Sequence, residues 1–270
     1  MIYTILYIKV SMLEINKKIL FLDTCEVHFS DYPYDVEEVD FLNFRYCKNK
    51  VNVKGFNRHK ELTSIIDLTQ DLDTIWKNMD KKNVRYRINR AKREGIEIQT
   101  NKDYKQFFEM YKSFIKKKGI KSLFDIFGVG SIDLKTMKEK GTLFVAKYYD
   151  ELLVGTLFLK DNQHIESWIG ASKRLDVDKR KKSLIACADR LIDWEAIKYA
   201  KERGIKEFDL GGLWSKKEAE KDIKKKRIND YKLYSGGKTV TRYSYQKSYS
   251  KTYDFLCYLY SLKNLQRKKS

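Results

Sequence analysis

One short segment brings a carboxylate next to backbone that a ligand can approach. The residues from Ile205 to Leu210 read as a buried strand, with Asp209 on the face opposite its apolar neighbours. The strand continues into Gly211 and Gly212, which have no side chain to keep a ligand away from the backbone. Asp209 can orient or deprotonate an amine, or it can accept backbone N–H bonds and shape the turn. We weigh these two roles equally.

A run of cations stands where a long helix begins. Apolar residues recur at helical spacing between Ser183, which can cap the helix start, and Gly204, which can end it. Arg180, Lys181 and Lys182 precede this helix directly. Free N–H groups and the helix dipole favour an anion at this end and disfavour cationic side chains. The run therefore predicts a bound phosphate, by roughly two to one over a solvent-exposed loop.

Two further basic segments can contact an RNA backbone. The first lies on a helix predicted from Thr69 or Asp71 to Gly95, and the second runs from Lys216 to Arg227. The candidate phosphate contacts in these segments are Arg85, Arg87, Arg90, Lys225, Lys226 and Arg227. A solvated surface explains the first segment about equally well, and a helix or loop of mixed charge explains the second. Contacts with RNA phosphates should weaken steeply with salt.

The composition indicates which kind of partner the protein binds and in which cellular compartment it is expected. The chain has 270 residues and a net charge of +19, which predicts an anionic partner: RNA, a phosphorylated substrate or an anionic membrane surface. Four cysteines without a CxxC pair favour buried thiols in a reducing compartment, and three scattered histidines predict neither a metal site nor a catalytic triad. Charged residues interrupt the apolar N-terminal segment, so we expect no signal peptide or membrane span, and a cytoplasmic protein.

The order of predicted elements gives a mixed α/β (α+β) fold. A helix from Asp103 and a three-stranded antiparallel meander from Gly141 precede the long helix and the buried strand. The less regular start contains strands expected at Ile2 to Val10, Lys18 to Leu22, Val51 to Lys54 and Ile65 to Leu68. The acyltransferase fold called GNAT has this order of elements, by analogy of fold alone. In this fold the phosphates of an acyl carrier bind at the N-terminus of the helix after the fourth strand, which corresponds to the long helix here. Common members bind coenzyme A there through a glycine-rich loop, whereas the corresponding segment "DKRKKSLIA" contains no glycine.

Three segments, in order, resemble the Fem-type (FemABX-like) peptidyltransferases, which add amino acids from aminoacyl-tRNA to cell-wall peptides. The segments are "KNVRYRINRAKREGIEI", "LIDWEAIKYAKERGIKEFDLGGLW" and "INDYKLYSGGKTV". The resemblance covers roughly Leu68 to Arg242, and the ordered set is more specific than any one segment. It implies two GNAT-like units: an abbreviated N-terminal one at 1–99 and a catalytic one at 100–245.

The remaining residues, 246–270, read as a basic amphipathic tail. Phe255, Leu259 and Leu262 form its apolar stripe, with cations clustered at its end. We expect the tail to pack on the N-terminal unit. Contact with a membrane surface is the alternative.

The resemblance also implies a reaction, in which the amine of an acceptor attacks the ester carbonyl of a charged tRNA. Lys232 would stabilise the tetrahedral intermediate. The family pattern, an aromatic–lysine pair followed by glycine, is matched by Tyr231, Lys232, Gly236 and Gly237, while Tyr234-Ser235 departs from its usual Phe-Gly. The substrate-binding residues expected with Lys232 and Asp209 are Arg180, Lys181, Lys182, Ser183, Gly211, Gly212, Trp168, Trp214 and Tyr231. Tryptophans such as Trp168 and Trp214 belong to a core more often, by roughly three to one.

These observations give a first function and two alternatives. The first is an aminoacyl-tRNA-dependent peptidyltransferase acting on a cell-wall precursor, of bacterial murein or an analogous archaeal polymer. It needs no cofactor beyond aminoacyl-tRNA as co-substrate, and we expect a monomer in the cytoplasm or at the inner membrane surface. The second is an acyl-coenzyme A N-acyltransferase acting on an amino sugar or amino acid in surface-polysaccharide synthesis. The third is a non-catalytic protein that binds RNA or membrane through its basic surface.

Overall fold

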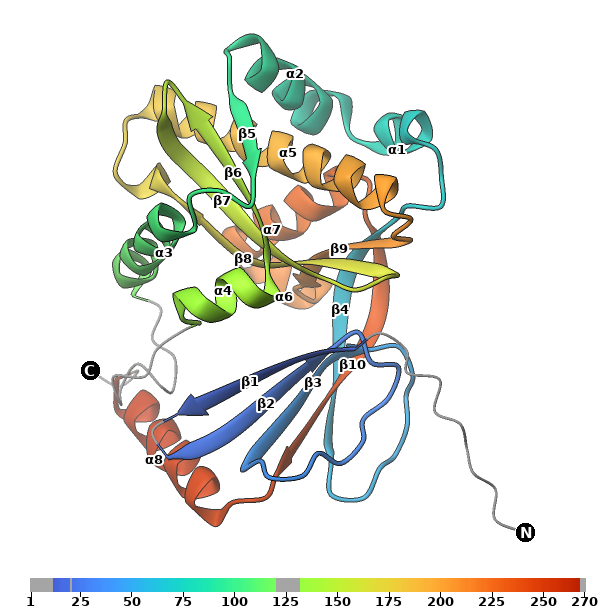
Figure 1. Ribbon diagram of the computed structural model, residues 1–270, viewed down its shortest axis with the longest axis vertical. Helices are drawn as coiled ribbons and strands as arrows, with labels where there is room; N and C mark the ends of the chain where they lie inside the picture. The colour runs from blue at the N-terminus through green and yellow to red at the C-terminus, as the bar shows by residue number, and fades with distance from the viewer. Residues whose placement is uncertain (1–11, 20, 120–131, 268–270) are drawn as a thin grey trace. The chain divides into compact units, whose positions relative to one another are not determined.

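The computed structural model describes residues 12–19, 21–119 and 132–267, with side chains as far as Leu259 (Figure 1). The described chain divides into two units: one is formed by the residues before Leu62 and from Thr241 on, the other by the residues between Leu62 and Val240. This division differs from the predicted boundary at residue 99, because residues 62–99 contribute strand and helices to the larger unit. The strand predicted at Ile2 to Val10 lies outside the described residues.

The sheet of the larger unit is antiparallel except at the strand after the long helix. Its strand order is β4 (Asn57–Asp67, in this unit from Leu62), β9 (Glu207–Leu213), β8 (His164–Ser172), β7 (Glu151–Lys160), β6 (Thr142–Tyr148) and β5 (Glu97–Thr100). Strands β8 and β9 run parallel. A parallel pair needs a crossover, which the long helix α5 (Lys179–Glu202) supplies between them.

Alternation along β6 assigns the two faces of this sheet to different helices. Phe144 and Ala146 face a core shared with α5 and with α2 (Tyr86–Arg93), whereas Leu143 and Val145 face a core shared with α3 (Tyr104–Lys118) and α4 (Leu134–Lys140). Helix α3, the meander, α5, β9 and β5 all form where the sequence predicted them. The predicted mixed α/β class is therefore confirmed.

The cap of α5 differs from the prediction. The helix begins at Lys179, because the Asp178 carboxylate accepts the backbone N–H of Lys181 at 3.0 Å. Ser183 therefore lies inside the helix, and it is not the N-cap.

The helix predicted from Thr69 or Asp71 to Gly95 is broken into three parts. They are α1 (Leu72–Asn78), a π-helical turn η1 (Lys81–Arg85) and α2. The break falls at Asp80, whose carboxylate caps η1 by accepting the Asn83 N–H and whose own N–H donates to the carbonyl oxygen of Tyr234 at 2.8 Å. The last turn of a helix distant in sequence thus fixes the position of the break.

The smaller unit contains a sheet with the order β1 (Leu13–Ile19), β2 (Leu22–His28), β3 (Phe41–Cys47) and β10 (Lys238–Ser248, in this unit from Thr241). Strands β2 and β3 are parallel and the other neighbours antiparallel. Cys25, Phe44 and Tyr245 are among the buried residues of its small core. The strand predicted at Lys18 to Leu22 is wrong, since Lys18 belongs to the end of β1 and Leu22 to the start of β2, with Phe21 in a turn and Leu20 outside the described residues. No strand forms at Val51 to Lys54.

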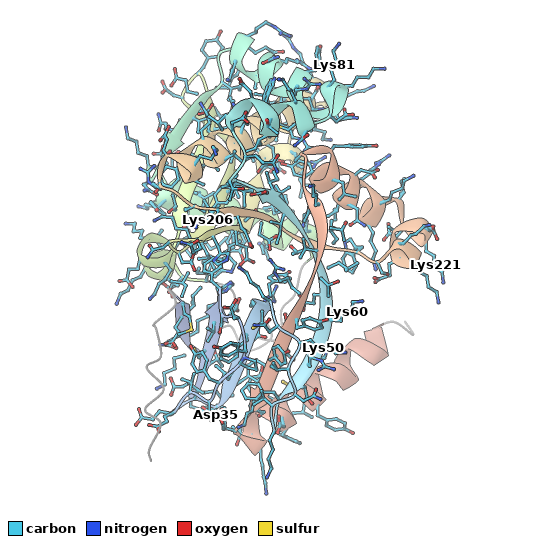
Figure 2. The ribbon with its side chains drawn as sticks, turned by 90° about the vertical axis from the view of Figure 1, so that its right-hand side faces the viewer. Asp35, Lys50, Lys60, Lys81, Lys206 and Lys221 are labelled. Carbon is cyan, nitrogen blue, oxygen red and sulfur yellow. The ribbon has the colours of Figure 1, made fainter. Side chains whose placement is uncertain are left out.

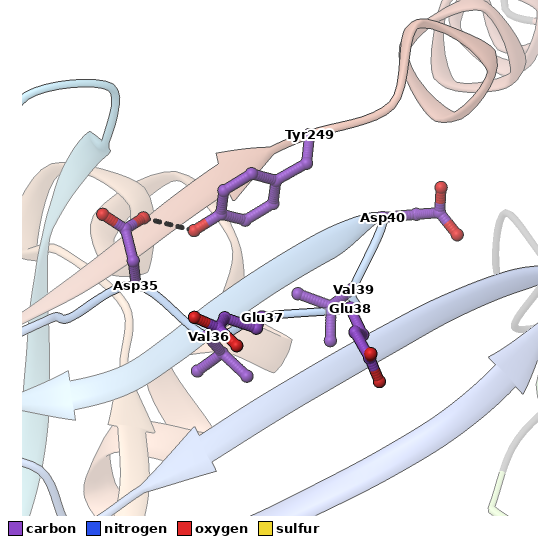
Figure 3. Close-up of a pocket in the computed structure, with 7 residues that line it drawn as sticks. All are labelled: Asp35, Val36, Glu37, Glu38, Val39, Asp40 and Tyr249. Carbon is purple, nitrogen blue, oxygen red and sulfur yellow. Dashed lines mark hydrogen bonds between the residues drawn. The ribbon is translucent and has the colours of Figure 1, made fainter.

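A pocket of about 500 Å³ opens in the smaller unit (Figure 3). Its lining is mostly acidic: Asp35, Val36, Glu37, Glu38, Val39, Asp40 and Tyr249. The hydroxyl of Tyr249 and the ammonium of Lys247 both donate to the Asp35 carboxylate. Asp40 accepts the backbone N–H of Asp23 at 2.8 Å. These contacts within the protein account for two of its carboxylates.

The C-terminal tail forms a helix, α8 (Lys251–Arg267), in the smaller unit. Its contact differs from the predicted stripe. Tyr253 is 8% exposed and stacks on Phe41 with ring centroids 4.3 Å apart, whereas Phe255 and Leu259 are 57% and 42% exposed. The side chain of Leu262 lies outside the described residues. The tail therefore packs against the N-terminal strands through a different residue from those expected.

Candidate active site

Lys232 lies in the last turn of α7 (Ile223–Tyr234), a helix that the sequence pattern did not predict. Its ammonium reaches β9, where Nζ donates to the carbonyl oxygen of Gly212 at 2.6 Å. The turn predicted at Gly211 and Gly212 is wrong, because both residues continue the strand at a break in its register with β4. A Cβ atom on Gly211 would lie 3.3 Å from Nζ, and the φ of +86° at this residue favours glycine. The predicted glycine pair and the predicted lysine therefore form one site.

Asp209 lies in the same site and shapes the backbone at this break in register. Its Oδ1 accepts the backbone N–H of Gly211 at 2.7 Å and the hydroxyl of Thr63 on β4. In the parallel pair of strands, Asp209 is opposite Glu166 of β8, which is 6% exposed. Of the two roles considered for Asp209, these hydrogen bonds show that of a backbone N–H acceptor, in a strand instead of a turn.

The charges around Lys232 come from three different elements. Burial lowers the pKa of Lys232, whereas the carboxylates of Asp209, Asp193 and Glu166 act to raise it. Because these carboxylates lie on β9, α5 and β8, only the folded chain assembles them. They stabilise a protonated lysine in a partly dehydrated position, where its charge acts more strongly than it would in water.

Glycine is required at the two positions after Lys232, Gly236 and Gly237, for different structural reasons. Gly236 has a φ of +89°, and its N–H donates to the carbonyl oxygen of Leu233 at 3.0 Å, which ends α7. A Cβ on Gly237 would lie 2.0 Å from the Oγ of Ser64, so only glycine fits there. Ser235, which departs from the family pattern, is 1% exposed and donates to the carbonyl oxygen of Tyr231 at 3.0 Å.

The cations predicted to precede the long helix lie in its first turn instead, and one of them is already paired. Lys181 shares the Glu151 carboxylate with Lys173, while Arg180 and Lys182 are exposed. Ser183 Oγ accepts a hydrogen bond from Arg90 Nη1 at 2.9 Å. Two basic sets predicted separately, on α2 and at the start of α5, therefore meet.

The cations on α2 and its neighbouring turn differ in their partners. Arg90 also binds Glu94, with Nε 2.5 Å from Oε1. Arg85 and Arg87 are half-buried. Exposed cations such as Lys81, in η1, and Lys221, in α6 (Lys216–Lys221), point into solvent (Figure 2).

The second basic segment packs around an exposed tryptophan. Lys225 Nζ lies 3.8 Å from the centroid of the Trp214 ring and 3.0 Å from Oε1 of Glu218. Trp214 and Asn229 exchange two hydrogen bonds. The backbone N–H of Trp214 donates to Asn229 Oδ1 at 2.9 Å, and Asn229 Nδ2 donates to the carbonyl oxygen of Trp214 at 2.8 Å. Lys226 and Arg227 are exposed. Trp168, by contrast, packs half-buried in the core beneath α3.

Sequence reasoning missed four residues around Lys232: Thr63, Glu166, Arg190 and Asp193. One signal was available, because Arg190 and Asp193, together with Asp189, interrupt the apolar run from Leu184 to Trp194, and Arg190 and Asp193 are buried. Nothing comparable marked Thr63 and Glu166, because they join the site only through strand pairing.

Two classes of feature are absent from the described part of the chain. It contains no group of three His, Cys, Asp or Glu side chains placed to hold a metal ion. None of the helices in residues 12–19, 21–119 and 132–267 is long and apolar enough to cross a bilayer.

Neither the protein-family models nor the curated proteins give a match to this sequence. Solved structures do. FemX has a TM-score of 0.59 at 13% identity, covering 87% of this chain and 83% of its own. L-PGS from Bacillus licheniformis has a TM-score of 0.53 at 12% identity, covering 93% and 85%.

A third similar structure is the C-terminal domain of an Agrobacterium fabrum protein described as a lysylphosphatidylglycerol synthetase. It has a TM-score of 0.51 at 11% identity and covers 84% of this chain and 78% of its own. At these identities the likeness establishes the fold alone. This chain therefore has the α/β fold of FemX and of the lysylphosphatidylglycerol synthetase domains.

Proposed function

We propose that this protein is an aminoacyl-tRNA-dependent peptidyltransferase of the Fem type, acting on an amine of a cell-wall precursor. The observation that carries the proposal is the ammonium of Lys232, held 2.6 Å from the carbonyl oxygen of Gly212 beside Asp209. It occurs on a fold shared with FemX, in a chain whose three ordered segments resemble the same family.

The reaction needs charge stabilisation more than it needs a nucleophile. The acceptor amine attacks the ester carbonyl, an amide bond forms, and the ester oxygen leaves with the tRNA ribose, taking up the proton that the amine loses. Lys232 would donate to the oxyanion of the tetrahedral intermediate. Asp209 would orient the acceptor amine through its charge.

For tRNA contact we propose the surface formed by α2 and the first turns of α5. Arg87, Arg90, Arg180 and Lys182 supply cations there. Binding through phosphates predicts a steep fall in affinity between 50 and 200 mM salt. Arg85, Lys225, Lys226 and Arg227 extend the proposed set of contacts.

The acyl-coenzyme A alternative has one observation against it. The Asp178 carboxylate already accepts an N–H at the start of α5, where the GNAT analogy places the carrier phosphates. The fold shared with lysylphosphatidylglycerol synthetase domains makes a lipid hydroxyl a second acceptor class worth testing.

A transfer assay tests the proposal. Purified protein is given total tRNA charged with radiolabelled amino acids, together with cell-wall precursors or phosphatidylglycerol, in parallel with labelled acetyl-coenzyme A. We expect label to move from tRNA to the precursor, and Lys232→Ala to lower the rate by about 10²-fold or more. Lys206→Ala, at an exposed lysine outside the proposed tRNA contacts, is the control and should leave the rate unchanged. Transfer from acetyl-coenzyme A alone would overturn the proposal.

A further inference from the structure

A cluster of polar side chains lies beside Lys232, and the transfer reaction does not use it. Tyr231 Oη donates to Asp193 Oδ2 at 2.6 Å. Arg190 Nη1 donates to the carbonyl oxygen of Tyr231 at 2.8 Å and to Ser235 Oγ at 2.5 Å. The guanidinium carbon of Arg190 lies 3.4 Å from the centroid of the Tyr231 ring, a cation–π contact. We call these four residues the Arg190 cluster.

Helix α7 needs such contacts because it has no buried apolar face. None of its residues is fully buried, and Ile223, Ile228 and Leu233 are 59%, 44% and 40% exposed. A surface helix is ordinarily held by an apolar stripe against the core, and α7 lacks one. Polar contacts must therefore fix its position. The Arg190 cluster forms hydrogen bonds with Tyr231 and Ser235, at the two ends of the turn that contains Lys232.

The partners of the cluster come from α5, which is anchored in the core. Arg190 and Asp193 are 5% and 7% exposed, and their neighbours Leu191 and Ile192 are buried in the main core. A buried, charged hydrogen bond has a defined geometry, because solvent cannot substitute for either partner. The cluster therefore holds the last turn of α7 in a fixed position against α5.

We propose that Arg190, Asp193 and Tyr231 are positioning residues, which hold Lys232 Nζ at Gly211 and Gly212 of β9 and set its charge. The kinetic part of this proposal rests on the proposed function, whereas the placement and charge of Lys232 can be measured without it.

Charge links the cluster to Lys232 as well as geometry. Burial, reinforced by the nearby Asp189 carboxylate, raises the pKa of Asp193 to about 7, and Arg190, Tyr231 and Lys232 oppose this shift. On its other sides Lys232 faces Asp209 and Glu166. When Asp193 ionises near neutral pH, Lys232 gains a third carboxylate and retains its proton more firmly.

Two variants separate the roles of the hydroxyl and the carboxylate. Tyr231→Phe keeps the ring over Arg190 and removes the bond to Asp193, whereas Asp193→Asn keeps an acceptor for Tyr231 and removes the charge. Asp230→Asn removes a carboxylate from α7 outside the cluster and is the matched control.

The first measurement is the reactivity of Lys232 toward acetic anhydride as a function of pH, quantified by mass spectrometry. In Asp193→Asn the midpoint of labelling should fall, because the ammonium loses a stabilising carboxylate, and Lys232 should label several-fold faster at pH 7. Tyr231→Phe should also increase labelling, since the lysine is less firmly held. Asp230→Asn should behave as the wild type.

The second measurement is the kinetics of transfer. Tyr231→Phe should lower kcat about tenfold or more with less than a threefold change in KM, because a misplaced lysine loses transition-state stabilisation. Altered labelling without transfer activity in the wild type would uphold the positioning role and overturn the proposed function. Wild-type labelling and kcat in Tyr231→Phe would overturn the positioning role, and this variant keeps the test decisive even if Asp193→Asn does not fold.

Discussion

Each unit of the protein contains a tyrosine hydroxyl bonded to an aspartate, and the two pairs behave differently. In the larger unit Tyr231 donates to Asp193, which is 7% exposed. In the smaller unit Tyr249 donates to Asp35, whose side chain is 61% exposed (Figure 3). Burial raises the pKa of Asp193 to about 7, whereas hydrogen bonds from Lys247 and Tyr249 lower the pKa of Asp35.

The comparison teaches that burial, not the identity of the partner, decides what such a pair does. In water the ionised carboxylate is already stable, and a donor stabilises it further. Out of water the ionised form is penalised, even with a tyrosine and an arginine beside it. Only the buried pair therefore makes α7 and Lys232 sensitive to substitution and to pH.

Removal of the buried cation should have the largest effect on stability. Arg190→Ala leaves two aspartates without their cation beneath α7, and should lower the free energy of unfolding by about 3–5 kcal/mol. The matched surface change, Lys247→Ala, removes the cation beside Asp35 and should cost under about 1 kcal/mol. Urea unfolding followed by circular dichroism measures both. A similar loss in the free energy of unfolding for the two variants would contradict the claim that burial decides the effect.

Glycines extend the contrast with a smaller effect. Gly237→Ala places a Cβ 2.0 Å from Ser64 Oγ and should cost about 1–3 kcal/mol through overpacking. Gly55→Ala in the smaller unit would meet only the flexible end of Lys247, at 3.1 Å, and should cost about 1 kcal/mol for its φ of +83°. Ser64→Ala should restore part of the stability lost in Gly237→Ala. No restoration in urea unfolding of the double variant would show that Ser64 is not the obstacle.

The two aspartates should also give opposite dependences of stability on pH. Unfolded Asp193 ionises near pH 4 and folded Asp193 only near pH 7, so its contribution to the free energy of unfolding falls as pH rises through this window. For Asp35 the folded pKa is the lower one, so its stabilisation is present above about pH 4 and is lost as pH falls through the folded pKa.

Stability curves from pH 3 to 8 test this sign difference. Asp193→Asn should remove a slope of at most about 1.4 kcal/mol per pH unit between pH 4 and 7. Asp35→Asn should leave that window unchanged and weaken the rise in stability near pH 4. A steeper decline in Asp193→Asn than in the wild type would contradict the raised pKa.

Strong local patterns in the sequence were sufficient to predict most of the larger unit. Apolar spacing in "YKQFFEMYKSF" and alternation in the meander specify their elements, because each pattern matches one backbone period. The glycine pair in β9 and the Tyr231–Lys232 pattern also led to residues that the folded chain brings within 2.6 Å of one another. The smaller unit was predicted less well, because burial along β2 and β3 does not alternate strictly from one residue to the next.

The sequence by itself determined α3, the meander, α5, β5 and β9 of the larger unit and the identity of the lysine at its candidate site. Tertiary structure alone decided how that lysine is held. Helix α7 has no apolar stripe for periodicity to detect, and its position depends on Arg190 and Asp193, about 40 residues earlier in the chain. Whether a charged residue is paired and buried depends on what packs against it, and spacing along one segment carries no information about a partner on another.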